Sequence, residues 1–171
     1  SFNTAVGYLA GNLVTTGIKN TIVGALAGDA LTDADFNVAL GYNTLSSDTL
    51  GSQTVAIGSG ALYTQNFTSA TASNNTAVGH DAGNKVTTGV QNTIVGALAG
   101  DAMTSGDSNT FIGYFSAGNG VVTGDTNTAV GVSAGLALTS GSNNLCLGKD
   151  AGRTGSPGGN VTTHNNKIFL S

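Results

Sequence analysis

Acid–base or nucleophilic chemistry would be expected to involve a histidine, and His80 and His164 are the only two in this chain of 171 residues. His80 is followed directly by Asp81 and serines are abundant, so a serine–histidine–aspartate hydrolase is the first hypothesis to weigh. In the repeat described below, however, the position of His80 holds tyrosine, alanine, serine, valine or lysine, which is typical of a solvent-facing corner. No Gly-x-Ser-x-Gly motif accompanies it. We therefore expect no catalytic residues and no enzymatic activity.

Metal and cofactor sites are also not expected. Asp33 and Asp35 are the only close aspartate pair with appeal as calcium ligands, and the glycine–aspartate repeat of calcium-binding solenoids is absent. Asp and Asn also favour turns, because their side chains bond to the local backbone. Cys146 is the single cysteine, which excludes an intramolecular disulfide and a thiolate cluster. The glycine-rich segments lack the lysine of a phosphate-binding loop.

Three surface features could bind a partner without catalysis. A column of threonines, one in most repeats, would give regularly spaced hydroxyls and so suggests ice binding, although threonine also favours strands on its own account. Two irregular insertions interrupt the repeat at 62–74 and 153–166, and the first carries Tyr63 and Phe67 as a candidate recognition loop. A tolerated bulge without a ligand is the alternative. Corner tyrosines such as Tyr42 could stack on sugars or pack over a neighbouring repeat.

The composition describes a folded chain with few charges and many glycines. Hydrophobic residues make up 39% of the chain, charged residues 8%, and the formal net charge is −4. Five basic residues, scattered singly, do not favour nucleic-acid binding, and no apolar run has the length for membrane insertion. Because 27 glycines would destabilise regular elements, we expect most of them at positive φ or at close backbone approaches.

These residues lie in a repeat of about 17 residues. The segment NTIVGALAGDA occurs twice without change, at Asn20–Ala30 and Asn92–Ala102. Aligning on its first glycine places equivalent glycines, mostly 17 residues apart, at Gly7, Gly24, Gly41, Gly58, Gly79, Gly96, Gly113, Gly131 and Gly148. Units this short cannot bury a face alone, so we expect an all-β, parallel β-solenoid with two short strands per coil. The chain 1–171 would be a single repeat domain of nine coils and a partial terminal coil.

The strand before each glycine is apolar at two consecutive positions, whose side chains point to opposite faces. We expect the larger, branched row to fill the coil core: Val6, Val23, Leu40, Ile57, Val78, Val95, Ile112, Val130 and Leu147. We expect the preceding row to face outward and form an oligomer interface: Ala5, Ile22, Ala39, Ala56, Ala77, Ile94, Phe111, Ala129 and Cys146. Strands that are apolar on both faces are buried on both faces, so the sequence predicts an obligate oligomer. A monomer with an exposed alanine stripe is the alternative.

The repeat resembles two groups of surface proteins. TVAIGSGA (Thr54–Ala61) looks like the coil motif in the head domains of trimeric autotransporter adhesins. The string NTAVGYLAGNLVTTGIKNTIVGALAG more closely resembles the Gly-Asn-Thr repeat regions of phage tail-fibre and tail-spike proteins. The resemblance runs from Asn3 to Leu170 and implies a β-roll with three chains side by side and a role in surface attachment. The stalk, membrane anchor and folding-chaperone domain of such proteins are not seen in the chain.

We therefore expect a rigid trimeric rod that presents binding loops, as a segment of a phage tail fibre for host attachment. A bacterial adhesin head or a self-assembling extracellular filament is the alternative, and an ice-binding solenoid a further one. The expected location is the virion or the cell exterior. Expected partners are two further copies, adjoining fibre domains or head-to-tail copies at the ends, and a cell-surface glycan or receptor.

Overall fold

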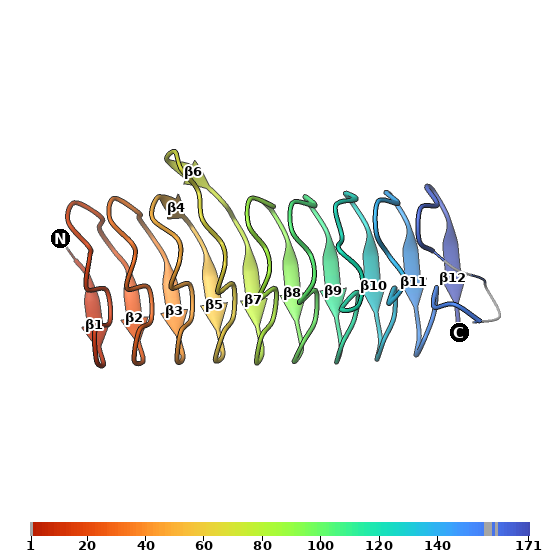
Figure 1. Cartoon of the computed structure of the whole chain (residues 1–171), viewed down its shortest axis with the longest axis horizontal. Coiled ribbons are helices and arrows are strands. Elements are labelled where there is room, and N and C mark those ends of the chain that lie inside the picture. The colour runs from red at the N-terminus through yellow and green to blue at the C-terminus, as the bar shows by residue number, and fades with distance from the viewer. Residues whose placement is uncertain (1, 156–158, 160) are drawn as a thin grey trace.

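The protein is a single stack of parallel coils (Figure 1). The structure, a computed structural model, describes residues 2–155, 159 and 161–171. Within these residues ten three-residue strands form one parallel sheet, in the order β1-β2-β3-β5-β7-β8-β9-β10-β11-β12. Their bounds are β1 Thr4–Val6, β2 Thr21–Val23, β3 Val38–Leu40, β5 Val55–Ile57, β7 Thr76–Val78, β8 Thr93–Val95, β9 Thr110–Ile112, β10 Thr128–Val130, β11 Leu145–Leu147 and β12 Ile168–Leu170. The predicted parallel β-solenoid is confirmed.

The register of the sheet follows the sequence repeat. Ala5 pairs with Ile22, Ile22 with Ala39 and Ala39 with Ala56, each pair 17 residues apart. The interval lengthens to 21 between Ala56 and Ala77. It lengthens again to 23 between Cys146 and Phe169. Extra residues are therefore accommodated outside the strands. Part of the second predicted insertion, 153–166, lies outside the described residues.

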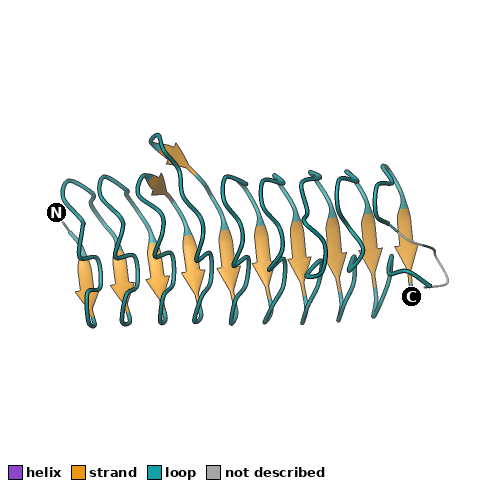
Figure 2. Cartoon of the chain, viewed as in Figure 1, coloured by secondary structure: helices purple, strands orange, loops and turns teal. Residues whose placement is uncertain are grey.

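The prediction of two strands per coil is wrong. In the described chain a second strand occurs only as the pair β4 (Gly51–Ser52) and β6 (Thr71–Ala72), near the first insertion (Figure 2). Elsewhere the return segment is a chain of turns, because residues such as Leu26 and Lys19 adopt positive φ of 57° and 58° and interrupt an extended backbone. Single backbone bonds still join these turns, for example from Leu13 N to the Asp29 carbonyl oxygen at 3.1 Å.

The repeated glycine is required by contact between coils. Gly96 has φ of 130°, and a Cβ atom there would lie 2.6 Å from the carbonyl oxygen of Gly113 in the next coil. Its amide donates to the Val78 carbonyl oxygen at 2.8 Å. The expectation that this column of glycines marks close backbone approach is confirmed.

A ladder of buried asparagines runs along the interior, and the sequence analysis did not identify it. The backbone N–H of Asn109 donates to Oδ1 of Asn92 at 2.8 Å. Nδ2 of Asn92 donates to the Gly106 carbonyl oxygen at 2.9 Å. The same pattern links other coils through Asn20, Asn37, Asn75, Asn127 and Asn144. The side-chain amide of each asparagine therefore satisfies backbone groups of the neighbouring coil that would otherwise be buried without partners.

One coil replaces this ladder with a larger polar network. Thr54 stands where the repeat has asparagine, and its Oγ1 lies 2.6 Å from Oγ of Ser73. Gln65 Nε2 donates to Asp48 Oδ2 at 2.6 Å and to Thr54 Oγ1 at 3.2 Å. Asp48 Oδ1 accepts the backbone N–H groups of Gly51 and Phe67. The first insertion thus supplies Ser73 and Phe67 to the coil interior.

Candidate functional site

The two apolar rows of the strand lie on the faces opposite to those predicted. In the expected interface row, Ala39, Ala56 and Ile94 are 0% exposed and lie inside the coil. The hydrophobic core contains this row from β2 to β11: Ile22, Ala39, Ala56, Ala77, Ile94, Phe111, Ala129 and Cys146. Ala5, in the first strand, is exposed. The prediction that this row forms the oligomer interface is wrong, because its side chains are covered by their own chain.

The predicted core row instead points outward. Val6, Leu40 and Leu147 are 59%, 44% and 47% exposed, and Ile112 is also exposed. Val23, Ile57, Val78, Val95 and Val130 are half-buried. The assignment of these residues to the coil core is therefore also wrong.

The physical reason is that strand alternation says which residues share a face but not which face is inside. The interior already holds residues from the return segment. Leu45 and Leu62 are fully buried in the coils of Ala39 and Ala56. In the coils of Ile22 and Ile94 the equivalent position is glycine: a Cβ atom on Gly28 would lie 3.5 Å from Ile22, and one on Gly100 would lie 3.1 Å from Phe111 and 3.5 Å from Ile94. Where leucine occupies this return position, as at Leu45 and Leu62, the inward strand residue is alanine.

The outward face of the ten-stranded sheet is a candidate interface. Besides the aliphatic row at the third residue of each strand, the first residue of each strand also faces outward. This second outward row consists of Thr4, Thr21, Val38, Val55, Thr76, Thr93, Thr110, Thr128, Leu145 and Ile168. In these described strands no outward position is charged. The face therefore combines an aliphatic row with a threonine-rich row along the whole sheet.

The two residues of the candidate recognition loop differ in their exposure to solvent. Phe67 is only 6% exposed and packs beside Asp48 and Gly51, so it cannot contact a large ligand. Its assignment as a recognition residue is wrong, because the insertion folds it into the coil. Tyr63 is 39% exposed and lines an open hollow with Tyr42.

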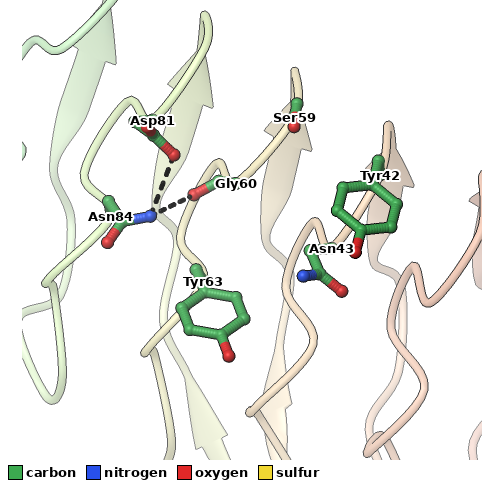
Figure 3. Close-up of a pocket in the computed structure, with 7 residues that line it drawn as sticks. All are labelled: Tyr42, Asn43, Ser59, Gly60, Tyr63, Asp81 and Asn84. Carbon is green, nitrogen blue, oxygen red and sulfur yellow. Dashed lines mark hydrogen bonds between the residues drawn. The ribbon is translucent and has the colours of Figure 1, made fainter.

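This hollow has a volume of about 200 Å³ and spans three coils. Figure 3 shows Asp81 and Asn84 on one side, Asn43 and Tyr42 on the other, and Tyr63 between them. Nδ2 of Asn84 donates to Oδ1 of Asp81 at 3.0 Å and to the Gly60 carbonyl oxygen at 3.2 Å. Sequence reasoning missed Asn43, Asp81 and Asn84 as parts of one site. The available signal was the second residue after the repeated glycine, which changes here from leucine to Asn43, Gly60 and Asp81.

The residues considered above for catalysis or metal binding interact with nearby groups of the chain. His80 Nδ1 lies 3.4 Å from Asp81 Oδ2, and the His80 side chain is 63% exposed. Asp33 Oδ1 accepts from Thr16 Oγ1 at 2.6 Å, and Asp35 Oδ1 accepts from the backbone N–H of Ile18 at 2.8 Å. Among the described residues no group of three or more His, Cys, Asp or Glu side chains is placed to hold a metal ion.

The corner threonines bond to the neighbouring coil. Thr32 Oγ1 donates to the Thr49 carbonyl oxygen at 3.0 Å, and Thr87 Oγ1 to that of Thr104 at 3.1 Å. Thr139 Oγ1 makes the same contact with the Thr162 carbonyl oxygen. These hydroxyl hydrogens are directed along the stack rather than outward, which disfavours this column as an ice-binding surface.

Comparison with known proteins does not identify a family. No protein-family model matches the chain, and neither a curated protein nor a solved structure gives a significant match. Across the described residues we find no helix of the length and apolar character needed to span a bilayer.

Proposed function

We propose that the chain is a shaft segment of a surface-attachment fibre, as in a phage tail fibre, and that three copies assemble side by side. The observation that carries this proposal is the outward aliphatic row, which runs along the face of an uncharged parallel sheet. Parallel sheets are ordinarily covered on both faces. Here the coil covers one face, and a second copy of the same sheet would cover the other.

Hydrophobic burial favours this assembly. Burying a Val, Leu or Ile side chain completely contributes about 1.5–3 kcal/mol relative to leaving it exposed. Leu40 and Leu147 leave nearly half of their surfaces uncovered in one chain. The same row recurs on ten strands. Side-by-side packing of three such sheets around one axis would cover this row without using the ends of the stack.

A fibre role also fits the mechanical properties of the stack. With strands about 4.8 Å apart, the ten strands extend roughly 45 Å. Backbone hydrogen bonds join the described coils to their neighbours, and asparagine amides add further bonds in most of them. A rod of this kind would hold a binding site at a fixed distance from the virion, outside the host cell.

The solution mass of the purified chain tests the assembly. We expect about 50 kDa by light scattering, three times the 16.7 kDa of one chain. The double variant Val78→Lys/Val95→Lys should lower the mass toward one chain while circular dichroism retains the β signal, because both side chains point outward. Thr88→Lys places one such charge on an exposed corner and should remain trimeric. A wild-type mass of one chain, or a trimeric double variant, would contradict the proposal.

A further inference from the structure

The hollow beside Tyr63 arises from a local departure from the repeat. At the second position after the repeated glycine, the flanking coils carry Leu9, Leu26, Leu98 and Phe115. The three coils of the hollow carry Asn43, Gly60 and Asp81 instead. A Cβ atom on Gly60, at φ of 70°, would collide with the Asp81 carboxylate. The absence of a side chain at Gly60 therefore makes the space that the Asp81 carboxylate occupies.

The lining combines two kinds of contact. Tyr42 and Tyr63 are 56% and 39% exposed, and their phenol rings lie at the opening. The carboxylate of Asp81 and the amide of Asn43 add acceptors and a donor at the same opening. Asn84 holds Oδ1 of Asp81 in place through its amide N–H. A ligand that suits this lining has an apolar C–H face and several hydroxyl groups around its edge.

We propose that the hollow binds one ring of a neutral saccharide. One face of a pyranose carries C–H groups, which pack against the electron-rich face of a tyrosine. Its hydroxyls donate to the Asp81 carboxylate and exchange hydrogen bonds with the Asn43 amide. Tyr63 provides the platform, Asp81 and Asn43 orient the ring, and Asn84 is a positioning residue that acts through Asp81.

The volume and the charge of the hollow restrict the class of ligand that it can bind. The hollow, at about 200 Å³, is smaller than sites of roughly 300–1,000 Å³ that enclose drug-sized molecules. It therefore suits a single terminal sugar ring. An acidic sugar would place its carboxylate close to Asp81 on a chain of net charge −4, which repulsion disfavours. A metal ion is disfavoured because the described residues contain no group of three or more His, Cys, Asp or Glu side chains placed to hold one.

This inference deepens the proposed function, because it names the ligand class of an attachment fibre, but the hollow is formed within one chain. Three copies on a trimeric rod would raise the apparent affinity for a densely glycosylated surface through multivalency. Binding and assembly can therefore fail separately.

Saturation-transfer NMR on the full chain, with the methyl glycosides of glucose, galactose and mannose as probes, tests the site. We expect transfer to ring C–H protons of at least one neutral glycoside. Tyr63→Ala should abolish it, and Asp81→Asn should weaken the affinity about tenfold through loss of a charge-assisted hydrogen bond. Tyr114→Ala is the matched control, because Tyr114 occupies the same corner position as Tyr42 but lies outside the hollow.

Several results would overturn the inference. These are no transfer to any of the three glycosides, transfer that survives Tyr63→Ala and Asp81→Asn, transfer only to sialic acid, and transfer only after calcium is added. Light scattering on the same samples separates the two proposals. A trimer without sugar binding contradicts only the saccharide site, and a monomer that binds sugar contradicts only the assembly.

Discussion

At the scale of single residues, the reactivity of Cys146 reports which face of its strand lies inside the coil. Its side chain is fully buried in the coil, and a Cβ atom on Gly152 would lie 2.7 Å from its sulfur. Burial raises the pKa of the Cys146 thiol to about 11, and a backbone hydrogen bond with Gly135 opposes this shift. Both the barrier to access and the scarcity of thiolate protect the sulfur from reaction.

We therefore predict that Cys146 reacts with a disulfide reagent only after unfolding. At pH 8 the folded chain should react roughly 100-fold more slowly than the urea-unfolded chain, because the thiolate is the nucleophile. The control is Thr88→Cys with Cys146→Ala, which moves the thiol to an exposed corner and should react rapidly in the folded state. Rapid labelling of native Cys146 would contradict its placement inside the coil.

Asp48 is a second buried group whose ionisation affects stability. Desolvation raises the pKa of its carboxyl above the ordinary value of 3.8, although hydrogen bonds from Gln65, Phe67, Gly51 and Leu50 oppose the rise. The folded state therefore holds this proton more tightly than the unfolded state. The stability that Asp48 contributes is complete below the unfolded pKa and is lost as pH rises through the folded one.

We predict that the free energy of unfolding falls as pH rises above about 4, by at most about 1.4 kcal/mol per pH unit for this one proton. Urea unfolding at a series of pH values measures the slope. Asp48→Asn should flatten the slope without abolishing it, because burial also raises the pKa values of Asp29 and Asp101. An unchanged slope in Asp48→Asn would show that another group is responsible.

At the scale of the strand and its turns, the sequence predicts the repeat and the parallel stacking of the coils. It does not predict which of the two apolar rows faces the coil interior. The glycine column and the two apolar rows locate the strands correctly from Thr4 to Leu170. Neither row is polar, so alternation alone cannot choose the inner one. The inner row is the one whose side-chain size is complementary to the return segment: Ala39 lies in the same coil as Leu45, and Ile94 in the same coil as Gly100. This complementarity can be recognised only once the fold of the return segment is known.

The return segment itself was less predictable. Leucine, lysine and glutamine ordinarily avoid positive φ, yet Leu98, Lys19 and Gln91 adopt it at 57°, 58° and 60°. The residue types of the return segment therefore favour a strand. Contacts with adjacent coils impose turns there instead. For the hollow, Tyr63 was identified from composition, whereas Asp81 and Asn84 belong to the next coil and become neighbours only through stacking.

The asparagine ladder allows a prediction at this scale. Asn92→Ala removes the amide that accepts from the Asn109 N–H and donates to the Gly106 carbonyl oxygen. Leaving these two buried groups unpaired should lower the free energy of unfolding by about 2–6 kcal/mol. Asn12→Ala, at an exposed corner, should change it by less than about 0.5 kcal/mol. Equal effects of the two substitutions on urea unfolding would contradict a structural role for the ladder.

At the scale of the whole molecule, the stack is close to one-dimensional. Each strand of the described sheet pairs only with its immediate neighbours in the stack. Stability is then approximately the sum of contributions from coils and from the contacts between adjacent coils. The duplicated segment follows from this arrangement: Thr21 and Thr93 occupy equivalent positions in strands β2 and β8, and each coil meets similar neighbours above and below.

Deletion of a whole number of coils should therefore leave a shorter but intact stack. Removing residues 20–91 joins Lys19 to Asn92, and because Asn92–Ala102 repeats Asn20–Ala30, the local sequence after Lys19 is unchanged. β1 should then pair with β8 in the register that it uses with β2. We expect β-rich circular dichroism, cooperative urea unfolding and a smaller m-value, since less surface is exposed on unfolding. Removing residues 20–99 also deletes β8 (Thr93–Val95) and places Ala5 26 residues before Phe111, so the joined coil no longer has the repeat length and this control should be less stable. If the two deletions behaved alike, the coil would not be the unit from which the molecule is built.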